Sequence, residues 1–321
     1  MQIHFVIYIL FFIVAGAILA KAGTWTVSSL LKIAKFLRWK KFIVATVLMG
    51  FLSSMPELFV GITSAATRKS ELSFGNVIGA NIILLTLVIG IAVLLGGKLK
   101  LKDKALNKSM MFAALYALLP LLLIVDGEIS RGDGVILILA MIFYLRELIL
   151  NQRQVRERFL DGTEDIGEEF RAFFKNLIIF LSGISLMILS AELMVFSAGR
   201  LALTFHVPLV LIGVLGVALG TSLPEVSFGI RSALMKEKEL VLGNVFGSVI
   251  INSTLVLGIV ALISPFRVYS LPLYIDGFIF TGLVVLIFLI FAKTKNEISK
   301  KEAKFLLLLY ALFFVVQFFL K

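Results

Sequence analysis

Two glutamates, Glu57 and Glu225, stand inside apolar segments of the sequence, and each directly follows a proline. A carboxylate in the core of a lipid bilayer costs several kcal/mol on most scales, so by default it marks a functional site. A proline breaks the helix and frees backbone carbonyls that can bind a ligand. Serine and threonine hydroxyls precede both prolines. Carboxylate, hydroxyl and carbonyl oxygens form a hard ligand set, which suits Ca²⁺ and, at partial occupancy, Na⁺.

Both glutamates belong to one stretch that occurs twice, at a constant offset of 168 positions. The first copy reads Leu52-Ser53-Ser54-Met55-Pro56-Glu57 and then Gly75-Asn76-Val77-Ile78-Gly79-Ala80. The second copy reads Gly220-Thr221-Ser222-Leu223-Pro224-Glu225 and then Gly243-Asn244-Val245-Phe246-Gly247-Ser248. Glycines four residues apart let helix backbones approach closely. Interrupted helices at matching places in two halves of a membrane chain point to a transporter's binding site.

The charge of this ligand set indicates exchange. From the residues alone, the candidate ligands are the carboxylates of Glu57 and Glu225, the hydroxyls of Ser53, Ser54, Thr221, Ser222 and Ser248, and the carbonyls freed by Pro56 and Pro224. Two carboxylates neutralise one divalent ion, and when that ion leaves they need Na⁺ or protons in its place. The alternative, a structural pair of buried carboxylates, is the weaker interpretation for two symmetric copies. Asn76 and Asn244 are interpreted as helix–helix hydrogen-bonding groups.

The composition is that of a polytopic membrane protein. Of the 321 residues, 60% are hydrophobic and 16% are charged, whereas a soluble domain has roughly 25% charged residues. The absence of cysteine excludes disulfides, iron–sulfur clusters and thiol chemistry. His4 and His206 are too far apart to suggest a histidine metal site. The net charge of +11 is interpreted as positive residues flanking the spans rather than as a nucleic-acid surface.

The sequence predicts an all-α protein with ten transmembrane helices, arranged as two inverted five-helix repeats. The expected spans are roughly 3–28, 42–67, 72–97, 109–125, 133–150, 174–199, 207–235, 239–263, 271–292 and 303–320. Residues 1–150 form the first repeat, 151–173 a solvated cytoplasmic linker and 174–321 the second repeat. The doubled element covers about 43–90 and 211–258. Because five spans is an odd number, the second repeat enters from the opposite side of the membrane.

The distribution of lysine and arginine supports both termini outside the cell. With that orientation, 25 of the 31 lysines and arginines flank the cytoplasmic connections. Six lie on the other side, namely Arg68, Lys69, Arg131, Arg200, Arg267 and Lys321. This bias follows the positive-inside rule, so we expect a multi-pass protein of the cell membrane with the 151–173 linker in the cytoplasm. The acids Asp126, Asp133 and Asp276 near span ends are expected to be interfacial or capping residues.

At the doubled element the sequence resembles the Ca²⁺/cation antiporter superfamily, and most of all its prokaryotic Na⁺/Ca²⁺ exchanger branch. The resemblance rests on the two motifs quoted above and covers nearly the whole chain. It implies a central Ca²⁺ held by Glu57, Glu225 and the carbonyls of Ser53 and Thr221. An outer Na⁺ position is implied at the Ala218 carbonyl, Thr221, Ser222, Glu225 and Ser248. An inner Na⁺ position is implied at the Gly50 carbonyl, Ser53, Ser54 and Glu57.

Three positions depart from the family pattern. Ala80 stands where the inner position has a serine, Leu84 where the middle position usually has asparagine or aspartate, and Asn252 where it often has aspartate. The site therefore has two acids rather than three. A lower Na⁺:Ca²⁺ ratio, coupling to H⁺ or Li⁺, and a changed divalent preference remain open.

The sequence thus favours a secondary active antiporter that exports Ca²⁺ in exchange for Na⁺ by alternating access. In that family spans 1 and 6 move against a core of spans 2, 3, 7 and 8. We expect no cofactor, no nucleic acid and no enzyme activity, and a monomeric transport unit in the lipid bilayer. The alternatives are a Ca²⁺/H⁺ antiporter and, from other classes, a passive cation channel or an intramembrane enzyme. Two carboxylates favour tight binding of a cation, which argues against the rapid conduction of a channel.

Overall fold

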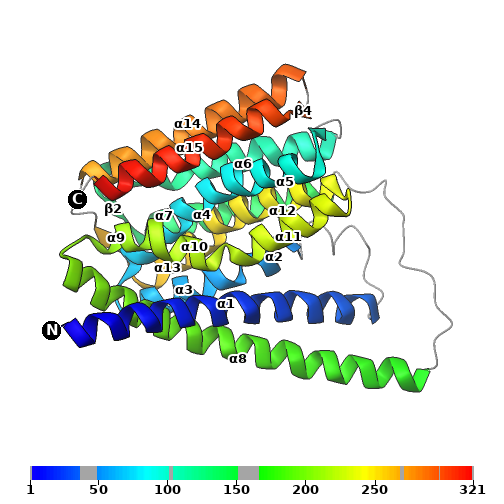
Figure 1. Ribbon diagram of the computed structural model, residues 1–321, viewed down its shortest axis with the longest axis horizontal. Coiled ribbons are helices and arrows are strands. Elements are labelled where there is room, and N and C mark those ends of the chain that lie inside the picture. The colour runs from blue at the N-terminus through cyan, green and yellow to red at the C-terminus, as the bar shows by residue number, and fades with distance from the viewer. Residues whose placement is uncertain are drawn as a thin grey trace.

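The computed structural model describes residues 2–36, 49–100, 104–150, 166–267, 271–295 and 297–319, which are almost entirely helical (Figure 1). The elements of the first half are α1 (Gln2–Phe36), α2 (Met49–Ser53), α3 (Met55–Ala66), α4 (Ser70–Ile83), the π-helix η2 (Leu84–Val88), α5 (Ile89–Gly96), α6 (Lys104–Leu123), the 3₁₀ turn η3 (Ile124–Asp126) and α7 (Arg131–Leu150).

The second half repeats this order. Its helices are α8 (Ile166–Phe205), α9 (Leu209–Ile212), the π-helix η4 (Gly213–Val217), α10 (Ala218–Thr221), α11 (Leu223–Leu234), α12 (Lys238–Ile251), the π-helix η5 (Asn252–Val256), α13 (Leu257–Ile263), α14 (Leu271–Lys295) and α15 (Lys300–Phe319). The residues 166–173, predicted as the end of the linker, therefore form the start of α8. The remainder of the predicted linker lies outside the described residues.

The helices confirm a polytopic helical membrane protein. In the described part of the chain seven helices are long and apolar enough to cross a membrane. An eighth span is added if Leu209–Thr221 and Leu223–Leu234, which meet at an angle of 43°, cross together. The predicted span 42–67 lies partly outside the described residues, and α7 has charged residues near both ends. The number of ten spans stays a prediction.

The doubled sequence element folds the same way twice. Helices α3 and α11, α4 and α12, and the π-helices η2 and η5 have identical bounds at the offset of 168 positions. The connections also match, because Arg68 and Lys236 both adopt a left-handed backbone, with φ of 57° and 63°. A left-handed residue is uncommon outside glycine, so its recurrence at matching positions is a specific sign of structural repetition.

Two short strand pairs join the halves at opposite ends of the bundle (Figure 1). Strand β1 (Leu99–Lys100) pairs with β4 (Glu297–Ile298), and β2 (Glu128–Ile129) pairs with β3 (Phe266–Arg267), both antiparallel. At the offset of 168, β1 corresponds to β3 and β2 to β4, within one residue. The internal repeat therefore relates the β1–β4 pair to the β2–β3 pair, with the first and second halves of the chain exchanged.

The doubled element occupies the centre of the molecule. In the most apolar 18-residue stretch of each span, 83% of the residues are buried for Ser70–Gly96 and 78% for Lys238–Ile263. The corresponding shares are 22% for Phe5–Leu30 and 33% for Arg171–Phe205. Helices α1 and α8 lie side by side along one flank, and α14 and α15 cover the opposite flank (Figure 1). The helices that carry the motif are thus surrounded by protein, while α1 and α8 are peripheral.

Candidate functional site

Each glutamate lies in the first turn of a helix that begins after a break. Ser54 and Ser222 have nearly the same non-helical backbone, with φ/ψ of −81°/4° and −83°/1°. A proline follows within the first two positions of each new helix, where its missing N–H costs no helical hydrogen bond. Glu57 and Glu225 come next, and both are fully buried. The predicted proline break is therefore confirmed in both copies.

The two breaks converge on one glycine of α1. A Cβ atom at Gly23 would lie 3.2 Å from Cγ of Pro56 and 3.5 Å from Cγ of Pro224. Glu57 and Glu225 directly follow these two prolines in the sequence. They are the only buried acidic or basic side chains in the part of the chain that the structure describes. The structure therefore buries two carboxyl groups in the interior of the bundle.

The interior polar atoms around these charges lack protein partners. Buried atoms without a hydrogen bond include both carboxylate oxygens of Glu57 and Glu225, the hydroxyls of Ser54 and Ser222, Nδ2 of Asn76, and both amide atoms of Asn244 and Asn252. Leaving such groups unsatisfied costs about 1–3 kcal/mol each, and more when charged. Among described residues no group of three or more His, Cys, Asp and Glu side chains could hold a metal. The arrangement therefore fits a cation held by two carboxylates and neutral oxygens.

The other predicted ligands make hydrogen bonds between the two copies. Ser53 donates to the Gly50 carbonyl at 3.1 Å, and its Oγ lies 2.6 Å from Oγ of Ser248. Thr221 donates to Oδ1 of Asn76 at 3.0 Å and lies 3.4 Å from the Ala218 carbonyl. Helix α2 is thereby joined to α12, and α10 to α4. The structure brings every predicted ligand into these two adjoining pairs of helices or the breaks beside them, except Asn252.

Asn252 is one turn farther along, at the first residue of η5, and is fully buried. Its two amide atoms have no protein partner. Leu84 occupies the corresponding first residue of η2. A π-helix inserted in an α-helix shifts the direction of the following side chains and is frequent at functional sites. These π-helices were not predicted from the amino-acid sequence.

Close approach of glycines makes the hydrogen bonds between the copies possible. A Cβ atom at Gly75 would lie 2.2 Å from the Val210 carbonyl oxygen, and one at Gly79 would lie 2.4 Å from that of Val214. The Cα atom of Gly247 lies 3.1 Å from the Cβ position of Gly50. These contacts confirm the predicted packing of small residues for three of the four motif glycines. Gly243 has no such neighbour within 4 Å among described residues.

One buried polar pair was missed. Nδ2 of Asn81 donates to Oγ of Ser253 at 2.7 Å, which joins α4 to η5. At the offset of 168, Asn81 corresponds to Val249 and Ser253 to Leu85. Comparison of the two copies could not reveal a pair that exists in one orientation only. A search for every polar residue within the apolar spans would have found it.

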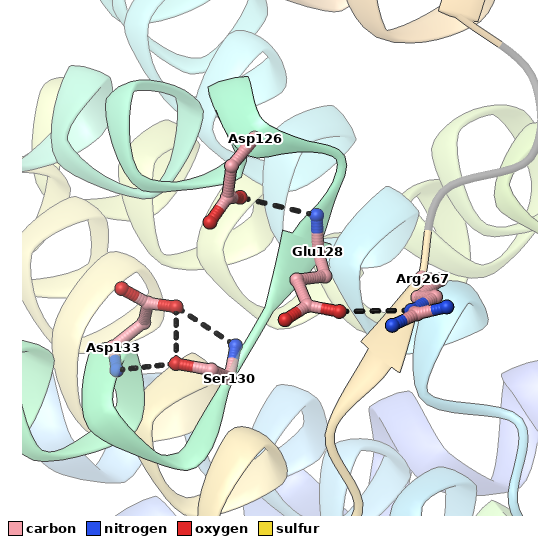
Figure 2. A network of polar contacts seen from close by, with 5 residues as sticks. All are labelled: Asp126, Glu128, Ser130, Asp133 and Arg267. Carbon is pink, nitrogen blue, oxygen red and sulfur yellow. Dashed lines mark hydrogen bonds and ion pairs between the residues drawn. The ribbon is translucent and has the colours of Figure 1, made fainter.

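The acids near the span ends are capping residues, as predicted, where the structure describes them. Oδ2 of Asp133 accepts hydrogen bonds from the backbone N–H and the hydroxyl of Ser130, at 2.8 and 2.7 Å (Figure 2). Asp126 accepts from the backbone N–H of Glu128 at 3.2 Å, and the Glu128 carboxylate pairs with Arg267 at 2.8 Å. These residues hold the β2–β3 end of the bundle together and are separate from the buried glutamates. The side chain of Asp276 lies outside the described residues.

Lys69 connects the turn between α3 and α4 to α8. Its Nζ donates to the Val195 carbonyl at 3.3 Å. Burial and the neighbouring Arg200 guanidinium lower the pKa of Lys69, because both disfavour the charged ammonium. This contact holds one end of a peripheral helix against the core.

The chain is similar to known sodium/calcium exchangers and membrane proteins. The family described as sodium/calcium exchanger protein matches residues 7–149 and 175–319. The chain is 28% identical to the sodium/calcium exchanger MaX1 of Methanosarcina acetivorans, covering 94% of this chain and 96% of that protein. It is 27% identical to the inner membrane protein YrbG of Escherichia coli, covering 70% of each.

Among solved structures, the fold is similar to that of the sodium-calcium exchanger NCX_Mj soaked with Na⁺ and Sr²⁺, with a TM-score of 0.66 and 25% identity over 96% of this chain and 97% of that chain. The family match spans nearly all of the sequence on both sides of the central connection. The chain therefore belongs to the sodium/calcium exchanger protein family of the Ca²⁺/cation antiporter superfamily, and is a cation antiporter of the membrane.

Proposed function

We propose that this antiporter exports Ca²⁺ in exchange for Na⁺, with the Ca²⁺ held between Glu57 and Glu225. The observation that carries the proposal is the pair of fully buried carboxylates whose four oxygens have no protein partner. Ionised carboxylates are seldom buried without a compensating charge. A dehydrated divalent ion supplies that charge and takes oxygen ligands. The carbonyls of Ser53 and Thr221 complete the proposed coordination, beside Na⁺ positions built from Ser54, Ser222, Ser248, Gly50, Ala218 and, farther along, Asn252.

The proposed mechanism is alternating access in an inverted repeat of ten spans. The matching bounds of α3 and α11 and the exchanged strand pairs support a pseudo-twofold relation between the halves. We infer that α1 and α8 move together against the core, because they contact each other extensively and are far less buried than the spans that carry the motif. Because Gly23 has no side chain, the backbone of α1 lies close to the prolines of both breaks. Both termini would lie outside the cell and the 151–173 linker in the cytoplasm.

A test is ⁴⁵Ca²⁺ uptake into proteoliposomes loaded with Na⁺. We expect uptake that requires internal Na⁺ and that is lost in Glu57→Gln and Glu225→Gln, since each removes one of the two buried charges. The matched control is Glu239→Gln, the same substitution at an exposed position of α12. Uptake that is unchanged in both buried variants would refute the proposed site.

A second candidate is exchange of Ca²⁺ for H⁺. It is favoured by the apolar side chains of Ala80 and Leu84, both fully buried, which offer no oxygen to a sodium ion. Uptake driven by a pH gradient in the absence of Na⁺ would identify this coupling. A passive channel would instead give flux without any counter-ion.

A further inference from the structure

We propose that the flank formed by α1 and α8 is an interface with a second copy of this chain. In this interface Lys21 of each copy pairs with Glu192 of the other copy. The inference goes beyond the proposed function, because it does not depend on which ions are transported. It rests on two exposed side chains of opposite charge near the middle of the membrane.

The proline breaks mark the middle of the bundle. Pro56 lies twelve residues before the left-handed turn residue Arg68, and Pro224 lies twelve residues before its counterpart Lys236. Twelve residues of helix rise about 18 Å. The two turns are at opposite ends of the bundle, one beside the β2–β3 strand pair and the other beside the β1–β4 pair. The breaks therefore lie about midway between the two ends.

Lys21 and Glu192 lie close to this level. Lys21 is two residues from Gly23, whose Cβ position is 3.2 and 3.5 Å from Cγ of the two break prolines. Glu192 is two residues from Met194, whose Cε lies 2.8 Å from the Cβ position of Gly220, one turn before the second break. Because an α-helix rises 1.5 Å per residue, both charged residues are within about one turn of the breaks.

Both side chains are exposed. Neither forms an ion pair with another residue in the described part of the chain. Nζ of Lys21 lies 5.3 Å from the ring centroid of Trp25, which is itself 45% exposed. The hydrocarbon core of a bilayer is about 30 Å thick, so its centre is about 15 Å from water on either side. An ionisable group exposed to lipid there is costly, so we expect another protein surface to cover it.

Polar residues also extend along the same faces of the two helices. On α8, Ser185 and Glu192 are both exposed and are seven residues apart, which places them on one face. Polar side chains hold transmembrane helices together, because lipid provides no hydrophobic driving force between helices. On α1, four exposed residues have the i, i+3, i+4, i+7 spacing of one helix face: Lys21, Thr24, Trp25 and Ser28.

A two-fold axis along the membrane normal brings the opposite charges together. Rotation about this axis leaves the depth of every residue unchanged, so only residues at similar depth can pair between copies. Lys21 and Glu192 meet this condition. Helices α1 and α8 lie side by side on one flank (Figure 1), so α1 of one copy can lie against α8 of the other. A two-fold contact is self-complementary, so it forms two such pairs.

The interface is compatible with the proposed transport mechanism. Glu57 and Glu225 are buried in the core of the same chain, so each copy keeps a complete candidate ion site. In the proposed mechanism the core moves relative to α1 and α8. A dimer that joins these two helices to those of a second copy would give both cores a common frame.

The first experiment crosslinks the two copies in membranes. The chain has no cysteine, so introduced cysteines report contacts without background. Lys21→Cys and Glu192→Cys chains with different tags are co-expressed and treated with a short bis-methanethiosulfonate, because a Lys–Glu pair separates its Cα atoms more than a disulfide allows. We expect a product that carries both tags and has twice the chain mass of 35.4 kDa. This mixed dimer still contains one intact Lys21–Glu192 pair.

The matched control replaces Glu192→Cys by Leu286→Cys, at an exposed position of α14 on the opposite flank. We expect no product of double mass in that mixture. Equal crosslinking in the two mixtures, or no crosslinking in either, would overturn the proposed interface.

The second experiment counts chains per particle by single-molecule photobleaching in liposomes. We expect two wild-type chains per particle. Lys21→Glu should give single chains, because it places two acids together, and Lys21→Glu/Glu192→Lys should restore the dimer, because it exchanges the two charges. Single wild-type chains at every protein-to-lipid ratio would overturn the interface. Equal dimer fractions in the single and double variants would overturn the pairing of Lys21 with Glu192.

Discussion

Replacement of Gly79 by alanine tests whether close packing of α4 against η4 and α10 shapes the ion site. The added Cβ would lie 2.4 Å from the Val214 carbonyl oxygen and 2.6 Å from Cβ of Ala218. To restore a 3.0 Å separation from that oxygen, the helices must move apart by about 0.6 Å. The hydrogen bond from Thr221 to Asn76 is 3.0 Å long and lies one turn away on both helices. The same movement would stretch it beyond hydrogen-bonding distance.

The expected cost has two parts. Overpacking a tight contact costs about 1–3 kcal/mol, and the lost hydrogen bond about 1 kcal/mol. We therefore expect Gly79→Ala to lower the free energy of unfolding by about 2–4 kcal/mol. If the hydrogen bond alone affects binding, the apparent Ca²⁺ affinity falls about 5-fold, the equivalent of 1 kcal/mol.

The assay compares denaturation in detergent and ⁴⁵Ca²⁺ uptake for Gly79→Ala and Gly282→Ala. A Cβ at Gly282 in α14 meets no described atom within 4 Å, so that variant controls for the higher helix propensity of alanine. Equal stability and equal apparent Ca²⁺ affinity of the two variants would show that close packing at Gly79 does not shape the ion site.

Three further predictions concern the site, the bundle ends and the topology. Asn76→Ala should lower the apparent Ca²⁺ affinity about 5-fold without unfolding the protein, because it removes one buried acceptor worth about 1 kcal/mol; an unchanged uptake curve would contradict this. Arg267→Gln should change the free energy of unfolding by less than about 1 kcal/mol, since its ion pair with Glu128 is exposed; a larger loss in denaturant titration would contradict this. In cells, a membrane-impermeant maleimide should label Arg131→Cys from outside and Glu239→Cys only after the cytoplasm is opened; labelling of both from one side would contradict the proposed orientation.

The doubled element was predictable because its ligands are residue types that an apolar span rarely contains. Glu57 and Glu225 are conspicuous in such a span, and their matching proline and hydroxyl neighbours predicted the breaks that the structure has. The motif glycines predicted the close approach of α4 to η4, because only glycine leaves room for it. Composition alone could not identify α4 and α12 as the most buried spans, because a lipid-facing helix and a buried one have similar composition. The family resemblance placed their spans in the core, and they are the most buried of the described spans.

Features that depend on tertiary contacts were not predictable. The π-helices η2 and η5 have no distinctive sequence, since both Leu84 and Asn252 begin one. Two-residue strands are too short for any periodicity, so the β1–β4 and β2–β3 pairs were missed. The start of α8 at Ile166 was also missed, because residues 166–173 contain several charges and lack the apolar run by which spans are recognised.

The most direct test of the account is the position of a bound divalent ion in a crystal of this chain soaked with Sr²⁺, located by anomalous scattering. We predict one strong peak between the Glu57 and Glu225 carboxylates, with oxygen ligands slightly farther away than the about 2.3–2.6 Å typical of Ca²⁺, because Sr²⁺ is the larger ion. We also predict loss of that peak in Glu225→Gln. Carboxylates that lie apart with no peak between them, in a protein that still transports Ca²⁺, would contradict it.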